Sequence, residues 1–349
     1  MKIEVTEFGH TKDGSAVEAY RITNSHGAYV TVLNYGAIVK DIAVPDKDGH
    51  ITDVVLGYDT LDKYETNPNF FGACIGRSGN RIANSTFTID GREYHLTENE
   101  GHNNLHSGPD GFEKHIWKAV PQERNGCVSF SLVSPDGDQG FPGNFKVTVT
   151  YMLTEQNKFK IHYEGISDAD TVANMTNHSY FNLNGEGSGS ILDHSVLIHA
   201  DGYTPVGEGL IPVGSVAPVA GTPFDFREMK KIGRDIAANG NEQLALAGGF
   251  DHNFALNGEG LRNVAEAVGD RSGIVMTVMT DQPGMQFYAG NYISGPAGKH
   301  GHEYKPRDGF AMETQHFPNS VNTPAFASPV IAAGSKYSTT TCYTFGTRK

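Results

Sequence analysis

The segment Phe145-Lys146-Val147-Thr148-Val149-Thr150-Tyr151 places an apolar side chain at every second position, with a polar side chain between each pair. Successive side chains of a β-strand point to opposite faces of its sheet, so this pattern predicts a strand with one buried face. The same period of two recurs close by, at residues 128–133 and 158–163. These neighbouring segments make antiparallel β-structure the basis of the predicted fold.

The same pattern extends toward both ends of the chain. Asp90-Gly91 lies between two short alternating segments and predicts a two-residue hairpin of type I′, because both residues tolerate positive φ. Helical periodicity is scarce and predicts one turn at residues 60–64 and a helix over residues 226–238, capped by Asp225 and stopped by Asn239-Gly240. Further strands are expected at residues 17–22, 29–33, 273–280, 285–288 and 336–345.

The chain of 349 residues is long enough for two average domains. However, loop-like stretches such as Ser134-Pro135-Asp136-Gly137-Asp138 lie between predicted strands, not between blocks of different composition. The 42 glycines and the 19 % of charged residues favour many turns over long surface helices. We therefore expect residues 1–349 to form one all-β domain, a large antiparallel β-sandwich with few short helices.

Charge and cysteine content restrict the partners and the compartment. A formal net charge of −13 opposes binding to nucleic acid or to an anionic membrane, so a neutral small molecule is the expected partner. Cys74, Cys127 and Cys342 form no CxxC pair and are typical of reduced thiols in the cytoplasm. The first residues do not resemble a signal peptide, and no apolar run has the length of a membrane span. We expect a cytoplasmic monomer or weak homodimer.

Several catalytic motifs are missing from the sequence. It contains no G-x-S-x-G elbow, no complete G-x-G-x-x-G and no phosphate loop ending in Gly-Lys-Ser/Thr. This argues against an α/β-hydrolase, a dinucleotide-dependent enzyme and a P-loop ATPase. His102 and His106 have the spacing of zinc ligands on a helix, but Gly101 and Asn103-Asn104 disfavour a helix there.

One acid and one imidazole, far apart along the chain, each lie in a polar setting. Glu313 belongs to Met312-Glu313-Thr314-Gln315-His316, an order typical of an acid at a strand end directed into a polar pocket. His178 belongs to Thr176-Asn177-His178-Ser179-Tyr180, whose polar groups favour a wet pocket over a dry core. Such a pair can move a proton on and off a neutral substrate. Alternatively, Glu313 forms half of a buried ion pair and His178 is a structural core histidine.

Other polar side chains have a binding interpretation and a structural one. The Arg81 guanidinium could donate to two neighbouring sugar hydroxyls or form a surface ion pair. Asp251 could accept bonds from two hydroxyls or serve as a turn acid. Taken alone, His106 is an ordinary loop histidine, and Gln282 is an ordinary turn residue before Pro283-Gly284.

Taken together, these segments resemble the aldose 1-epimerase (galactose mutarotase) family. The matching segments occur in the family's order and cover residues 76–82, 104–108, 176–183, 250–254, 283–291 and 313–322. Each is short, but the ordered set is specific and spans most of the chain. The resemblance implies a large β-sandwich, called a supersandwich, with an open cleft on one sheet and no need of a cofactor or metal.

The resemblance also implies a role for each candidate residue. Glu313 matches the general base of the family and His178 the general acid. The sequence departs from the commonest family pattern after His106, where two glycines often stand in place of Ser107-Gly108. The positions that match the family's substrate-binding residues are Arg81, His106, Asp251, Asn80 and Gln282.

The expected activity is the interconversion of the α and β anomers of free aldohexoses such as galactose and glucose. Glu313 would take the proton of the anomeric hydroxyl while His178 protonates the ring oxygen, each transfer contributing about 10²- to 10⁴-fold in rate. We expect the nearby carboxylate to raise the pKa of His178, so that the acid is cationic up to neutral pH.

Three alternatives remain open from the sequence. The first is a lectin-like binding protein with the same pocket and no turnover. The second is a glycoside hydrolase, which would need two carboxylates such as Glu313 and Asp251 flanking the bond. The third is a mutarotase relative acting on sugar phosphates, which would need a cationic pocket built from Arg77 and Arg81.

Overall fold

The computed structural model describes residues 1–238 and 240–348. Its largest sheet has nine strands, all antiparallel to their neighbours, in the order β11-β12-β13-β14-β28-β24-β23-β18-β21. The strand predicted at residues 145–151 lies inside this sheet, as its alternation requires. The bounds are β11 Lys118–Gln122, β12 Cys127–Ser134, β13 Phe145–Leu153, β14 Lys158–Ser167, β18 Ser195–Ile198, β21 Lys230–Lys231, β23 Arg262–Val268, β24 Ile274–Thr280 and β28 Lys336–Thr347.

Two smaller antiparallel sheets accompany the large one. The N-terminal sheet has the order β1-β2-β3-β4-β5, and a six-stranded sheet has the order β17-β26-β25-β22-β19-β20. The N-terminal strands are β1 Lys2–His10, β2 Ala16–Thr23, β3 Tyr29–Leu33, β4 Val39–Pro45 and β5 Ile51–Asp53. The six-stranded sheet consists of β17 Tyr180–Phe181, β19 Gly202–Tyr203, β20 Ala217–Pro218, β22 Asp251–Ala255, β25 Gly284–Tyr288 and β26 Phe310–Gln315.

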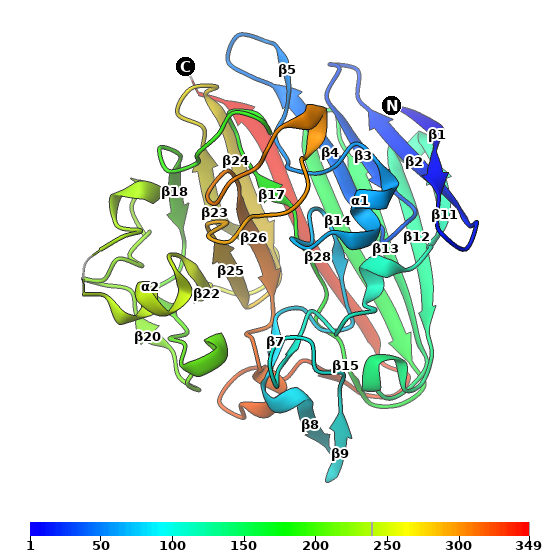
Figure 1. Cartoon of the computed structure of the whole chain (residues 1–349), viewed down its shortest axis with the longest axis vertical. Coiled ribbons are helices and arrows are strands. Elements are labelled where there is room, and N and C mark those ends of the chain that lie inside the picture. The colour runs from blue at the N-terminus through cyan, green and yellow to red at the C-terminus, as the bar shows by residue number, and fades with distance from the viewer. Residues whose placement is uncertain (239, 349) are drawn as a thin grey trace.

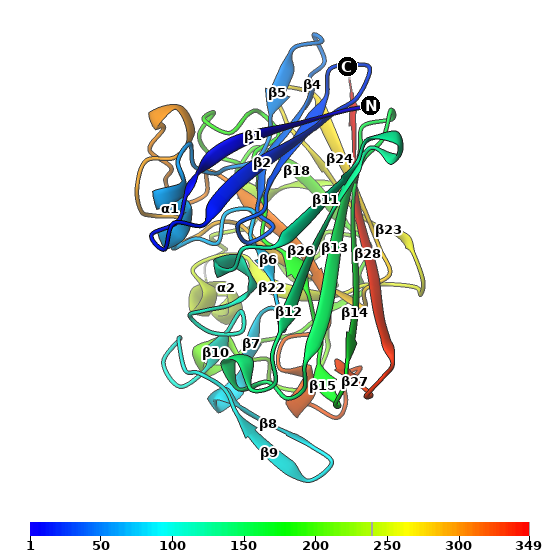
Figure 2. The same cartoon turned by 90° about the vertical axis from the view of Figure 1, so that its right-hand side faces the viewer.

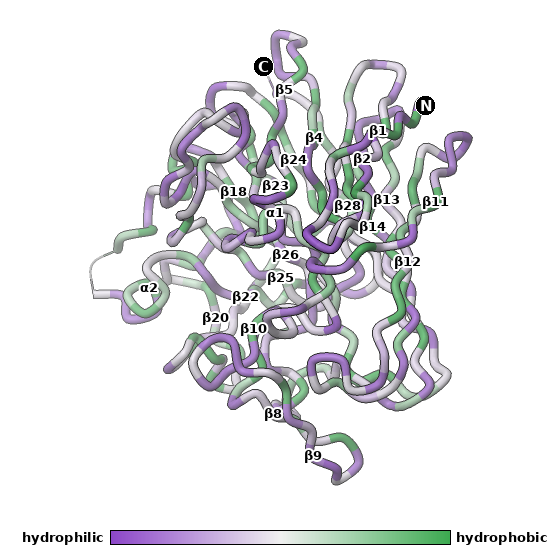
Figure 3. The backbone as a smooth tube through the Cα atoms, turned by 45° about the vertical axis from the view of Figure 1, so that its right-hand side comes forward, coloured by the Kyte–Doolittle hydropathy of each residue, from purple (hydrophilic) through white to green (hydrophobic). Residues whose placement is uncertain are grey.

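Both smaller sheets pack against the inner face of the large one and form the predicted sandwich. Tyr20 of β2 meets Phe130 of β12 edge to face at 5.5 Å, and Phe181 of β17 lies 5.0 Å from Tyr343 of β28. Figures 1 and 2 show the long strands β12, β13, β14 and β28 running side by side along one side of the molecule. In Figure 3 the hydrophobic colour follows strands of the interior, and hydrophilic residues gather in peripheral loops.

Short strand pairs and loops lie at the edge of this framework. The predicted hairpin is confirmed: β8 and β9 flank Asp90 and Gly91, whose φ angles are 49° and 80°. This hairpin projects from one end of the molecule in Figure 2. The short pairs are β8 Thr86–Ile89 with β9 Arg92–His95, β6 Cys74–Ile75 with β16 Thr176–Asn177, β7 Arg81–Ile82 with β10 Asn104–Leu105, and β15 Thr171–Val172 with β27 Val330–Ile331.

The helix predicted over residues 226–238 is wrong. The segment instead contains β21 and a short 3-10 turn at Ile232–Arg234, and the expected stop at Asn239 lies outside the described residues. Phe226 is drawn into the core, where its ring lies 5.0 Å from Phe250, so tertiary packing overrides the local pattern. In the described part of the chain, the α-helices are α1 Leu61–Thr66, where one turn was expected, and α2 Glu242–Ala247.

A buried charge cluster ties the loop between β25 and β26 to the N-terminal sheet. Lys299 Nζ lies 2.6 Å from Asp53 Oδ2 of β5 and 3.1 Å from Asp41 Oδ1 of β4. It also donates to the carbonyl of Val55 at 3.0 Å. The loop is therefore anchored before the chain enters β26. Within the described residues, no helix has both the length and the apolar character needed to cross a membrane.

Candidate active site

The candidate site is a pocket of about 350 Å³ over the six-stranded sheet. Asn253, Gln286 and Glu313 are directly opposed on β22, β25 and β26, so register alone places three polar side chains in one row. Met312, the neighbour of Glu313, belongs to the hydrophobic core, so Glu313 points to the other face of the sheet. The polar and aromatic lining includes Phe70, Asn80, Arg81, Glu100, His106, His178, Asp251, Gln286, Tyr288 and Glu313.

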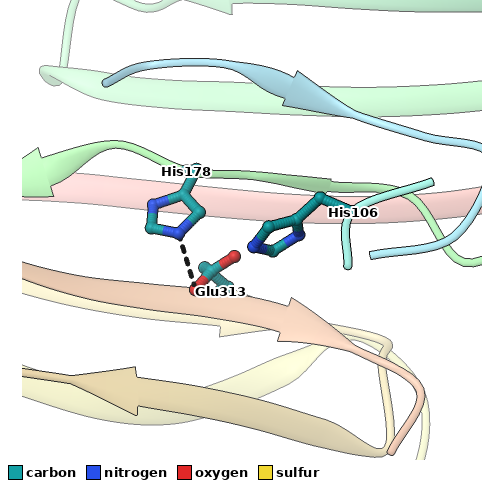
Figure 4. A group of neighbouring side chains, drawn as sticks. All are labelled: His106, His178 and Glu313. Carbon is teal, nitrogen blue, oxygen red and sulfur yellow. Dashed lines mark ion pairs between the residues drawn. The ribbon is translucent and has the colours of Figure 1, made fainter. Parts of the chain in front are cut away.

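The structure brings Glu313 and His178 together. His178 lies in the short connection between β16 and β17, and its Nε2 is 3.5 Å from Oε1 of Glu313. Figure 4 shows His178 and His106 approaching the carboxylate of Glu313 from separate segments of the chain. Both members of the pair are almost inaccessible, with side-chain exposures of 7 % and 3 %. The pair predicted from the sequence thus exists as a direct contact.

Burial controls the protonation of this pair. Loss of solvent lowers the pKa of His178 to about 4. The pKa of Glu313 is raised well above its usual value, first by burial and then by the negative charge of Asp251, while Arg81 opposes the shift. The expected upward shift of the His178 pKa by the carboxylate is therefore wrong, because burial disfavours the charged imidazole. Between these two pKa values the pair holds one proton.

His106 reaches the same pocket from the loop after β10. Its ring Nδ1 accepts the backbone N–H of Asn80 at 3.2 Å, and the backbone N–H of His106 donates to the carbonyl of Asn80 at 3.0 Å. Burial lowers the pKa of His106 well below its usual value, so the ring is neutral. A neutral imidazole with Nδ1 acting as acceptor carries its proton on Nε2. His106 is therefore a hydrogen-bond donor toward the pocket.

Arg81 is held by an acid that the sequence analysis missed. Its Nε and Nη2 lie 2.6 and 2.7 Å from the two carboxylate oxygens of Glu100, a bidentate pair that fixes the plane of the guanidinium. Both residues line the pocket. Glu100 lies in an unremarkable polar turn, and nothing in its local sequence distinguishes it from a solvated acid.

Asp251 also lies in the pocket, and its hydrogen-bond partner, Gln286, is not among the predicted site residues. Nε2 of Gln286 donates to Oδ1 of Asp251 at 2.6 Å. Gln282 stands in the turn before β25, where its backbone N–H donates to Thr280, and it is not among the described residues that line the pocket. Both glutamines flank Pro283-Gly284 in sequence; the strand register places only Gln286 beside Glu313.

Arg77 has a structural role. Its buried guanidinium donates to the carbonyls of Ser134 and Gly143 at 3.0 and 2.9 Å and to the Thr171 hydroxyl at 3.1 Å. It therefore binds loops together at a distance from the pocket lining. Because the charge of Arg81 is balanced by Glu100, the described residues that line the pocket form no cationic cluster of the kind that a sugar phosphate would require.

Several buried polar atoms of the site have no hydrogen-bond partner among the described residues. They include Nδ1 of His178, Oε2 of Glu313, Oε1 of Gln286 and both side-chain polar atoms of Asn253. An unpartnered buried polar group is costly, and such groups are uncommon in folded proteins. The residues His178, Gln286 and Glu313 line the pocket, and their unpartnered atoms fit a ligand with several hydroxyl groups.

Three side chains of the pocket, His106, His178 and Glu313, are close enough to be considered as ligands of a metal ion. Ligand atoms of His106, His178 and Glu313 lie within 4.8 Å of one another. However, a metal ion would bind His106 through the lone pair of Nε2. Because Nδ1 accepts the N–H of Asn80, Nε2 carries the ring proton and has no free lone pair. The donor set therefore fits a hydroxylated molecule better than a metal ion.

Comparison with known proteins gives a consistent result. The family model described as aldose 1-epimerase matches residues 18–344. Galactose mutarotase of Rattus norvegicus is 42 % identical over 348 residues, 99 % of both chains, and aldose 1-epimerase of Escherichia coli K12 is 39 % identical over 337 residues, 95 % of this chain and 96 % of the relative.

A solved structure extends this similarity to three dimensions. The crystal structure of an aldose epimerase homologue from C. elegans superposes with a TM-score of 0.87 at 31 % identity, over 94 % of this chain and 98 % of the other. Sequence and fold thus agree along nearly the whole length. The chain belongs to the aldose 1-epimerase family.

Proposed function

We propose that this protein is an aldose 1-epimerase that interconverts the α and β anomers of free aldohexoses such as galactose and glucose. The observation that carries the proposal is the contact of 3.5 Å between Glu313 and His178 in a pocket of unpartnered polar groups. The relatives named galactose mutarotase and aldose 1-epimerase support the same reaction. The three free, buried cysteines fit a reducing compartment such as the cytoplasm.

Ring opening needs one proton removed and another supplied. The positive charge of Arg81 lowers the pKa of Glu313 and so favours passing the shared proton to His178. The Glu313 carboxylate then takes the proton of the anomeric hydroxyl as the C1–O1 double bond forms. The bond between C1 and the ring oxygen breaks, and His178 protonates that oxygen. Rotation about C1–C2 and the reverse transfers close the other anomer.

The remaining polar side chains would hold the sugar while its ring opens. His106 offers a donor fixed by Asn80, and Asp251, oriented by Gln286, offers acceptor oxygens. Arg81, aligned by Glu100, offers its remaining N–H groups. These contacts are present before and after the chemical step, so they contribute chiefly to affinity.

Polarimetry of freshly dissolved α-glucose and α-galactose tests the proposal. Wild-type protein should accelerate the drift of optical rotation to equilibrium. Glu313→Gln should lower kcat by about 10²- to 10⁴-fold with little change in KM, because it removes the base. Asp251→Asn should mainly raise KM, because it removes a contact that is equally strong in the ground state and the transition state.

Two outcomes would favour the alternatives. Sugar binding without acceleration by the wild-type protein would indicate a lectin-like protein. Release of the aryl alcohol from an aryl glycoside, lost equally in Glu313→Gln and Asp251→Asn, would indicate a glycoside hydrolase with two catalytic carboxylates.

A further inference from the structure

The imidazole of His178 stacks with two aromatic rings. The ring of Tyr180 lies 4.8 Å away at an interplanar angle of 20°, and the ring of Phe70 lies 6.0 Å away at the same angle. Phe70 also contacts the second pocket histidine, since its ring centroid is 4.9 Å from that of His106. One partly exposed aromatic side chain therefore touches both imidazoles of the site.

No hydrogen bond at Nδ1 orients His178. That atom is buried and has no partner among the described residues, while Nε2 faces Glu313. Functional histidines are commonly oriented by a hydrogen bond at the ring nitrogen that does not act on the ligand. His106 has such a bond, from the N–H of Asn80. Among the described residues, the contacts that can set the ring plane of His178 are therefore its stacking partners and the carboxylate of Glu313.

Phe70 is held in an unusual backbone conformation. Its φ of 57° lies in the left-handed region, which bulky side chains rarely adopt and which persists only where the surroundings impose it. The surroundings do so on both sides. Asn67 accepts the N–H of Phe71 at 2.9 Å, and Asn69 exchanges hydrogen bonds with Ser294 of a separate loop at 2.5 and 3.2 Å.

The ring of Phe70 contributes little to the hydrophobic core. Within the described chain it belongs to none of the three clusters of buried apolar side chains and instead lines the pocket. Tyr180, in contrast, is a core residue that packs edge to face on Phe71 at 5.1 Å. The strained backbone thus serves to place an aromatic face against the two histidines.

We propose that Phe70 is a positioning residue that holds the His178 ring plane so that Nε2 stays directed at Glu313. The proposal rests on the proposed function. Tyr180 packs on the His178 ring from the core side, and Phe70 packs on it from the pocket side. The other titratable and charged groups that line the pocket are Glu313, His106, Arg81, Asp251, Glu100, Tyr288 and Tyr292.

Two substitutions at Phe70 separate positioning from simple packing. Phe70→Leu keeps apolar volume but removes the flat face, and it should lower kcat at least about tenfold with KM changed less than about threefold. Phe70→Tyr keeps the face and should restore kcat to within about twofold of wild type. Phe8→Leu, at a half-buried phenylalanine that packs near Tyr64 outside the pocket, should leave both constants unchanged.

A second measurement does not depend on turnover. NMR of the ring protons of His178, assigned with a His178→Asn variant, should show altered shifts and faster solvent exchange in Phe70→Leu and wild-type-like signals in Phe70→Tyr. Thermal unfolding confirms that each variant is folded.

Two results would overturn the proposal: unchanged kcat in Phe70→Leu, whether or not KM is raised, or unchanged His178 resonances in that variant. An intact kcat with raised KM would make Phe70 a platform for the sugar. A wild-type protein inactive in polarimetry would refute the proposed function instead, and the resonances would still decide the role of Phe70.

Discussion

Glu313 on β26 and His178 between β16 and β17 approach to 3.5 Å in a pocket that shields both from solvent. Their burial shifts the two pKa values in opposite directions, downward for the imidazole and upward for the carboxyl. The neutral forms are thereby favoured, and a single proton is shared at the point where the proposed reaction needs one acid and one base. This relationship determines the expected pH dependence.

The pH profile of kcat/KM should be bell-shaped, with its acid limb near pH 4. The pKa of His178 is about 4, so below this pH the imidazole is also protonated and the pair holds two protons. Glu313 is then protonated and can no longer act as the base. Above the raised pKa of Glu313 the shared proton is lost, and no acid remains. Polarimetry from about pH 3 to pH 10, with circular dichroism to confirm folding, measures both limbs. An acid limb centred near the usual histidine pKa would contradict the buried, neutral His178.

Glu313→Gln should stabilise the fold while it lowers kcat. A carboxyl whose pKa is raised on folding binds more protons in the native state, so its contribution to stability falls as pH rises from its unfolded pKa through its folded pKa. Glutamine does not ionise and so avoids the cost of a buried negative charge at high pH. The substitution should therefore raise the free energy of unfolding at pH 8 by on the order of 1 kcal/mol.

Thermal unfolding at pH 4.5 and pH 8 measures this effect. The gain in Tm should be small at the lower pH and larger at the higher one. Glu93→Gln, at an exposed position on the β8–β9 hairpin, should leave Tm unchanged at both values. A gain in Tm independent of pH would argue against a buried, titrating Glu313.

Gln286→Met should raise KM about tenfold, with a smaller effect on kcat. The substitution removes the donor that lies 2.6 Å from Asp251 and leaves a buried acceptor unpaired, a loss of about 1–3 kcal/mol. Gln282→Met is the matched control and should leave KM within about twofold of wild type, because its side chain lies outside the pocket lining. The reverse outcome would restore Gln282 as the substrate-binding glutamine. Initial rates over a range of galactose concentrations distinguish the two.

Lys299→Met should destabilise the protein by about 3–5 kcal/mol, because the buried Asp41 and the half-buried Asp53 lose their shared cation. Burial raises the pKa of Asp53 to about 6, with Lys299 opposing the shift, so the loss should grow as pH rises and the carboxyl ionises. Denaturant unfolding at pH 5 and pH 8 measures it. Lys231→Met, which breaks an exposed pair with Asp193, should cost less than about 1 kcal/mol. Equal losses for the two variants would contradict a special role of the buried cluster.

Strand alternation was sufficient to predict most of the large sheet and the β8–β9 hairpin, because a half-buried strand and a two-residue turn are governed by neighbouring residues. The helix at residues 226–238 failed for the opposite reason. Phe226 packs against Phe254 of β22 and Phe287 of β25, which a local window does not contain.

The amino-acid sequence by itself determined the strand periodicity, the family and the presence of Glu313, His178, His106, Arg81 and Asp251 in polar segments. Only the tertiary structure decided which atoms meet: Glu100 contacts Arg81, Gln286 contacts Asp251, and Phe70 contacts two histidines. It also decided the sign of the His178 pKa shift. The physical reason is that register and desolvation depend on residues distant in sequence, and a local pattern contains neither the partner nor the solvent that folding removes.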